Sequence, residues 1–267
     1  MKQSIGDRFF TWIKYPFILG GDVAGTVVEV GKKVTRFKVG DRVCGNAVGM
    51  DPRSNKCSEG GFQQYTVLRT NIASQIPDIL TFEQACVLPL CLSTASSGLF
   101  MQDYLALRPP STRRTPVSET VVVCGGSTSV GCNAIQLVHA AGYTVVATAS
   151  VKNHALLKSL GASATYDNKS PTVTQDIISF IKKSGQPCAG GFAIGRGSVK
   201  ACIVIVASVK TAPGKRKFVA QASMDQPDRF PESLYQFILF GFHVGCAMTA
   251  NMIKARISGV ALKFIWG

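Results

Sequence analysis

Residues 120–131 read TVVVCGGSTSVG, and they constrain the architecture of the chain more than any other segment. A continuous apolar run, Thr120–Cys124, leads into a glycine-containing turn and then into an amphipathic segment over 130–141 that Gly142 ends. An apolar run without alternation is typical of a strand buried on both faces of a sheet. The segment therefore predicts a strand, a tight turn and a helix.

Downstream of this segment, short apolar runs alternate with segments of helical spacing. Strands separated by helices of this length indicate βαβ units and a parallel sheet with flanking helices, a Rossmann-type arrangement. The predicted strands are 144–149 and 164–167, and the predicted helices are 154–160 and 173–183.

Upstream, the pattern is of short β-type runs separated by glycines, which predicts a small β-rich domain. Helical spacing follows over 82–92 and 93–107, and a linker rich in Pro, Arg, Ser and Thr covers 108–118. The predicted domains are 1–95, 96–225 and an atypical apolar end, 226–267. The predicted strands of the first domain lie in 22–30, 36–43 and 61–67.

Composition excludes several classes of protein. The 267 residues are 46% apolar and 16% charged, with a mean hydropathy of +0.20, as in globular proteins. The net charge of +14 comes in small basic groups without interleaved aromatic residues, so nucleic-acid binding is not expected. Nine cysteines without a C-x₂-C pair argue against zinc ribbons and favour reduced thiols in a cytoplasmic protein.

The glycine turn carries the predicted chemistry. Glycines between a strand and a helix let the backbone approach a pyrophosphate, which the free N–H groups of the helix stabilise. Any tight strand-to-helix turn also uses glycine, but the position after a buried strand favours a dinucleotide site. The predicted cofactor-binding residues of the turn are Gly125, Gly126, Ser127, Thr128, Ser129, Val130, Gly131 and Cys132.

The end of the second strand predicts which dinucleotide binds. An NAD enzyme places a carboxylate there for the ribose hydroxyls, whereas this chain has no acidic residue among Ser150, Val151, Lys152 and Asn153. A hydroxyl, a cation and an amide suit a 2′-phosphate, so NADPH is the predicted cofactor. The alternative is a polar helix start with Asn153 as N-cap and Lys152 solvated.

Five motifs occur in the order found in the medium-chain dehydrogenase/reductases, which the chain resembles. They are 20–27 (GGDVAGTV), 37–43 (FKVGDRV), 61–65 (GFQQY), 88–95 (LPLCLSTA) and the glycine turn. The turn, 150–153 and 202–207 look like the zinc-free fungal branch of trans-acting enoyl reductases that partner polyketide synthases. The resemblance implies a partial GroES-like domain before the Rossmann domain.

The resemblance also implies a reaction and its site. Gly21 and Asp22 stand where zinc members have a histidine ligand and a glutamate, so no metal is expected. Without a Lewis acid, NADPH-dependent hydride addition to the activated C=C bond of a small-molecule or carrier-bound acyl substrate is favoured. Tyr166 takes the adenine-side position. The implied substrate residues are Leu88, Pro89, Leu90, Cys91, Leu92, Ser93, Thr94 and Ala95, with Thr94 as a carboxamide partner or a helix N-cap.

The chain departs from this pattern at both ends, where it looks truncated, and over 234–257, which looks like an insertion with no partner strand. Polar interruptions in 234–253 argue against an integral membrane span. Removing 234–257 is expected to raise soluble yield. Three alternatives stay open: an inactive nucleotide-binding fragment, a quinone reductase, and a membrane-peripheral protein. Tyr65, Tyr104, Ser93 and water are all candidates for the proton donor.

Overall fold

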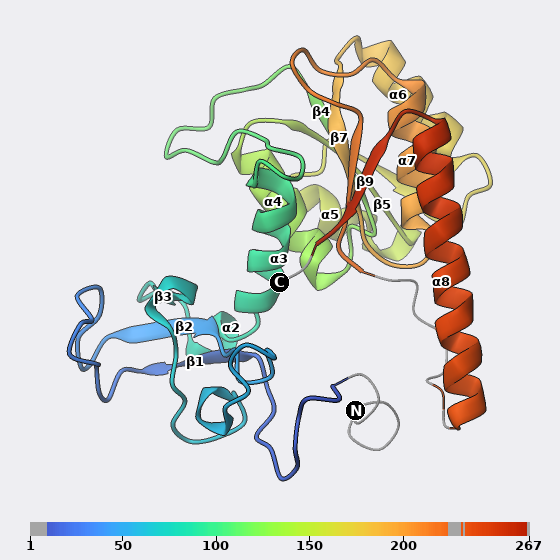
Figure 1. The fold of residues 1–267 in the computed structure, drawn as a ribbon. Helices are drawn as coiled ribbons and strands as arrows, with labels where there is room; N and C mark the ends of the chain where they lie inside the picture. Colours follow the sequence, from blue (N-terminus) through green and yellow to red (C-terminus); the bar gives the residue numbers. More distant parts are fainter. Residues whose placement is uncertain (1–9, 224–230, 232, 266–267) are drawn as a thin grey trace. The chain divides into compact units, whose positions relative to one another are not determined.

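The computed structural model describes residues 10–223, 231 and 233–265. The chain forms two compact units. The first holds residues 1–91 with 230–233, and the second holds 92–229 with 234–267. Figure 1 shows the ribbon of both units.

The first unit is built on a three-stranded antiparallel sheet in the order β1-β2-β3. Strand β1 covers Asp22–Thr26, β2 covers Arg42–Asn46 and β3 covers Ala73–Gln75. Short helices follow the loops at Cys57–Glu59 (η2), Thr70–Ile72 (η3) and Phe82–Ala85 (α2). Its buried apolar residues are few among the described ones: Ile13, Val43, Ala47, Ala73, Ile76 and Ala85.

Two predictions for this unit are wrong in detail. Residues 61–67 form bends rather than a strand, because their backbone bonds go to scattered partners: Gly61 to Gly20, Phe62 to Leu19 and Val67 to Ser58. The third strand is β3 instead. The two predicted helices over 82–107 are also replaced by α2 and by α3, Pro89–Phe100.

The second unit is a six-stranded parallel sheet in the order β6-β5-β4-β7-β8-β9. This is the doubly wound order, in which the chain starts at the centre, builds one half and then returns to build the other. The predicted fold class, a GroES-like β part followed by a Rossmann-type sheet, is confirmed. The strands are β4 (Thr120–Cys124), β5 (Thr144–Ala149), β6 (Ala164–Asp167), β7 (Cys188–Ala193), β8 (Phe218–Gln221) and β9 (Ala261–Phe264).

Helices cover both faces of this sheet. On one face, α4 (Ser129–Ala140) and α5 (His154–Ser159), preceded by η4 (Val151–Asn153), pack with α3 in one apolar cluster. On the other, α6 (Val173–Ser184) and α7 (Ser198–Ser208) form the second cluster. Strand β4 feeds both clusters by alternation: Val121 and Val123 face the first, and Val122 and Cys124 face the second.

Helix α8, Leu234–Ile257, connects β8 to β9. Its C-terminal turn contacts α7 and β9 and buries Ala255 in the second cluster. Figure 1 shows it on the same side of the sheet as α6 and α7. The sequence predicts an insertion without a partner strand; the structure makes it a helix that packs on α7 and β9, and the effect of its removal on soluble yield stays a prediction.

Candidate functional site

The glycine turn after β4 has a backbone shape that only glycine supplies at two positions. Gly125 has a φ of +87°, and a Cβ there would overlap the carbonyl oxygen of Ile194. A Cβ on Gly131, one turn into α4, would overlap the carbonyl oxygen of Gly125. The turn and the start of α4 therefore pack backbone against backbone, as a loop that admits a phosphate requires.

Thr148, near the end of β5, holds the turn in place. Its Oγ1 accepts a hydrogen bond from the N–H of Gly125 at 3.2 Å, and its carbonyl oxygen accepts one from the N–H of Gly126 at 2.8 Å. Only 4% of Thr148 is exposed. Two N–H groups of the turn are thus directed into the sheet and are not available to a ligand.

The remaining N–H groups at the start of α4 divide into capped and free ones. Thr128 is the N-cap, and its Oγ1 accepts from the N–H of Gly131 at 3.0 Å while donating to the carbonyl oxygen of Gly125 at 2.9 Å. Within the described part of the chain, the N–H groups of Ser127, Ser129 and Val130 have no acceptor. Free N–H donors at a helix N-terminus are groups to which an anion can bind.

The segment after β5 places polar groups beside this turn, because β4 and β5 are neighbouring parallel strands with Cys124 paired to Thr148. Ser150 and Asn153 are half-buried, and Lys152 is exposed. Among the described residues, none of these three side chains has a hydrogen-bond or ion-pair partner. Asn153 is the N-cap residue of α5 by position, but its side chain makes no capping hydrogen bond.

The other predicted cofactor residues lie around the same edge of the sheet. Val151 is 64% exposed in η4. Cys132 is partly buried, which raises the pKa of its thiol, and its Sγ donates to the carbonyl oxygen of Gly126 at 3.4 Å. Tyr166 on β6 packs edge-on against Phe180 of α6, with ring centroids 6.3 Å apart. Burial and, to a lesser extent, the charge of Asp176 raise the pKa of the Tyr166 hydroxyl.

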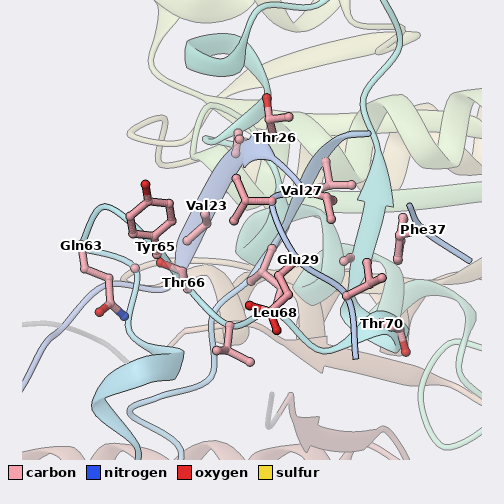
Figure 2. Close-up of a pocket in the computed structure, with 18 of the residues that line it drawn as sticks. Val23, Thr26, Val27, Glu29, Phe37, Gln63, Tyr65, Thr66, Leu68 and Thr70 are labelled. Atoms are coloured by element: carbon pink, nitrogen blue, oxygen red, sulfur yellow. The ribbon is translucent and has the colours of Figure 1, made fainter. Parts of the chain in front are cut away.

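The first unit has its own cavity, of about 760 Å³, over β1 and the loops around it. Figure 2 shows Gln63 and Tyr65 at one end and Phe37 and Thr70 at the other. Asp22 also lines the cavity, and its Oδ1 accepts the N–H of Leu90 at 2.7 Å. Burial raises the pKa of Asp22, which this hydrogen bond partly offsets.

The predicted substrate segment, 88–95, divides between the units after Cys91. It does not contribute to the cavity of the first unit, whose lining ends at Cys86. Ala95 is fully buried in the first apolar cluster of the second unit. Thr94 lies inside α3, so it is not a helix N-cap.

The candidate proton donors have different surroundings. Tyr104 is buried, and its hydroxyl donates to the carbonyl oxygen of Phe264 at 3.1 Å. Tyr65 is 65% exposed at the cavity of the first unit, and Ser93 is exposed on α3. In the described ranges no cluster of three or more His, Cys, Asp or Glu side chains could hold a metal ion.

Thr148 is the site residue that sequence reasoning missed. A threonine inside a run of strand residues is ordinary, because its branched Cβ favours strands. Its role depends on the register between β4 and β5, which places it opposite Cys124. The available signal was its position two residues before Ser150, at the carboxyl end of a strand beside the turn.

Comparisons with known proteins agree with this architecture. Residues 3–78 match the family model of the alcohol dehydrogenase GroES-like domain. A solved alcohol dehydrogenase superfamily protein from Novosphingobium aromaticivorans shares the fold, with a TM-score of 0.66 and 24% identity over 95% of this chain and 63% of that one.

Three curated fungal relatives are similar in sequence. The dehydrogenase pigH of Monascus ruber is 49% identical over 99% of this chain and 70% of its own length. The trans-enoyl reductase himH of Aspergillus japonicus is 46% identical over 64% of this chain and 48% of its own. The lovastatin nonaketide synthase enoyl reductase component lovC of Aspergillus terreus is 40% identical over 62% and 46%. The chain thus spans 70% of the first relative and about half of the other two. It belongs to the medium-chain dehydrogenase/reductase superfamily of oxidoreductases, in the branch of fungal dehydrogenases and trans-enoyl reductases.

Proposed function

We propose that the protein is a zinc-independent, NADPH-dependent reductase of an activated C=C bond in an enoyl thioester or an enone. The observation that carries the proposal is the set of free N–H groups at Ser127, Ser129 and Val130 beside a polar, carboxylate-free segment at 150–153. The first feature suits a pyrophosphate, and the second suits the phosphorylated ribose.

The residues of the chain would hold the cofactor in parts. The free N–H groups would bind the pyrophosphate, Lys152 and Ser150 the 2′-phosphate, and Tyr166 would lie toward the adenine. When bound, NADPH supplies the hydride. The protein supplies orientation and a dry site, which account for much of the rate of such reactions. Gly21 has no side chain that could bind zinc.

The substrate class follows from the relatives. Two of them are named as enoyl reductases, and the second of these, lovC, is named as the enoyl reductase component of lovastatin nonaketide synthase. We therefore propose a carrier-bound or small acyl substrate that binds near 88–95, with a polyketide synthase as the partner. All nine cysteines are free thiols, which supports a cytoplasmic location.

Titration of the full chain with NADPH and NADH, followed by nucleotide fluorescence, tests the cofactor. NADPH should bind at least about tenfold more tightly, which is about 1.4 kcal/mol. Lys152→Glu should remove that preference, because a carboxylate repels the 2′-phosphate and accepts the ribose hydroxyls. Lys158→Glu makes the same charge change in α5, farther along the chain and at an exposed position, and should leave the preference intact.

Equal affinities for the two nucleotides in the unmodified chain would refute the NADPH assignment. Turnover is tested separately by following NADPH oxidation with a crotonyl thioester and with a quinone. Oxidation with the thioester supports the proposed reaction, whereas oxidation with the quinone alone would replace it. Binding without turnover of either would reduce the proposal to nucleotide binding.

A further inference from the structure

Helix α8 is much longer than the connection it makes requires. Its 24 residues span about 36 Å, whereas β8 and β9 have four residues each, or about 13 Å. Only its C-terminal turn buries a residue, Ala255. Figure 1 shows the N-terminal part of α8 continuing beyond the sheet. About 20 Å of α8 therefore exceeds the length that the connection between β8 and β9 requires.

The outer face of α8 carries an apolar stripe with a heptad spacing. The stripe, which we call the α8 seam, alternates steps of four and three residues and consists of Tyr235, Leu239, Phe242, Cys246, Thr249 and Ile253. All six are exposed, Phe242 by 73% and Tyr235 by 70%. The one hydroxyl near its centre, on Thr249, already donates to the carbonyl oxygen of Gly245 at 2.9 Å. A sustained 3.5-residue repeat is the pattern by which one helix packs along another.

The exposed area is large enough for a stable pair. With Ile238 and Ile257 at its margins, the α8 seam leaves roughly 800 Å² of apolar surface uncovered. One partner of a specific protein interface contributes about 800 Å², and the largest apolar patch of a typical monomer is about 300–600 Å². Because the α8 seam lies on a single helix, a second helix of the same length would cover it.

A bilayer is the other possible cover, because α8 is the one described helix that is long and apolar enough to cross a membrane. Both ends of α8 are nevertheless tied to neighbouring strands of one sheet. The connection from β8, residues 222–233, carries Asp225, Asp228, Arg229 and Glu232 in its sequence. Inserting the N-terminal end of α8 would bring these charges to the bilayer, which is costly.

We propose that two copies of this chain associate through the α8 seam, with α8 of one copy packed along α8 of the other. The proposal is independent of the nucleotide chemistry. Cys246 lies at the midpoint of the helix, so full overlap places the two Cys246 thiols opposite each other whether the helices run parallel or antiparallel.

Sedimentation velocity of the full chain at about 1–50 μM tests the association. A dimer is expected, and Phe242→Glu should shift its dissociation constant at least about 100-fold, because a charge would enter the apolar contact. The matched control is Ile79→Glu, which places the same charge at an exposed apolar residue of the first unit, 88% exposed, and should leave the dimer unchanged. A monomer throughout, or a dimer that Phe242→Glu does not weaken, overturns the proposal.

Cross-linking tests the register. Diamide should join two Cys246 thiols in a disulfide, the two protons and two electrons passing to its N=N bond to give the hydrazine. A cross-linked dimer that Cys246→Ser abolishes is expected. A dimer cross-linked only through exposed Cys57 would overturn the assignment. So would a monomer that floats with phosphatidylcholine–phosphatidylserine vesicles, since that result gives the seam to a lipid surface.

Discussion

Thr148 is one of the residues that fix the shape of the glycine turn. Its hydroxyl and its carbonyl oxygen bind consecutive N–H groups of the turn, and it is almost fully buried. By occupying the donors of Gly125 and Gly126, it leaves the next free donors for a ligand. A buried polar side chain at this place is thus a positioning residue for the proposed pyrophosphate site.

Thr148→Val should weaken NADPH binding by about tenfold, because the isosteric change leaves the buried N–H of Gly125 without an acceptor, at a cost of about 1–3 kcal/mol. Thr148→Ser should restore binding. Thr120→Val is the matched control, since Thr120 is equally buried but lies at the opposite end of β4 and bonds to Gln186. It should lower stability without changing the affinity for NADPH. If the Thr148→Val protein bound NADPH with unchanged affinity, Thr148 would not be a positioning residue.

Because of Cys188, the free energy of unfolding should decrease as the pH becomes alkaline. Burial raises the pKa of its thiol to about 11 from an ordinary value near 9. A raised pKa favours the neutral thiol in the folded state, so this contribution is complete below pH 9 and is lost as pH rises toward 11. Urea unfolding should show that the stability difference between wild type and Cys188→Ala changes by about 2 kcal/mol between pH 8 and pH 10.5, to the disadvantage of wild type. A difference that does not change with pH would contradict this.

At the scale of elements, the second unit was far more predictable than the first. Strands β4, β5 and β6 and helices α4, α5 and α6 match the sequence prediction to within a residue at each end. Their apolar runs are long and their helices end at glycines. The first unit offers few such signals. Its strands are short and lie between glycine-rich loops, so their positions depend on pairing between segments that are distant in the sequence. Residues 61–67 have a strand composition but no neighbouring strand in register.

The candidate site shows the same contrast. The turn and the segment at 150–153 are local features, so the sequence alone could indicate them as candidates. Thr148 and the division of 88–95 between two units depend on pairing and packing between distant residues. The C-terminal contact of α8 could not be predicted either, because one buried alanine in an apolar helix looks like its neighbours.

Gly125→Ala tests the turn as an element. It should destabilise the fold by at least about 3 kcal/mol, since it combines an unfavourable φ with overlap against Ile194. Gly185→Ala is the matched control, because Gly185 has a φ of +70° and open space around it. It should cost only about 1–2 kcal/mol. Urea unfolding measures both, and equal losses would show that the contact with Ile194 does not constrain the turn.

At the scale of the whole molecule, the two units differ in how many apolar residues they bury. The described part of the first unit buries six apolar residues, several of them alanine, over a three-stranded sheet. The second has helices on both faces of six strands, with two extensive apolar clusters. Because stability follows buried apolar area, the two units should not open together.

Amide hydrogen exchange of the full chain measures this difference. Amides of β1, β2 and β3 should exchange at least about 100-fold faster than those of β4, β5 and β7, because opening the first unit exposes much less apolar surface. NADPH should slow exchange in the second unit around the glycine turn. Equal protection in the two sheets would indicate that they unfold as one cooperative body.

The alternation along β4 also bears on how such a sequence can diverge. Val121 and Val123 pack with α4, which begins at the glycine turn, whereas Val122 and Cys124 pack with α6 and α7, which carry none of the proposed cofactor residues. Neighbouring residues of β4 therefore contact different helix layers. In a saturation library of β4 that is selected for nucleotide binding, tolerated substitutions should accumulate at Val122 and Cys124, which face α6 and α7. Compensating substitutions should appear in α6 and α7 more often than in α4.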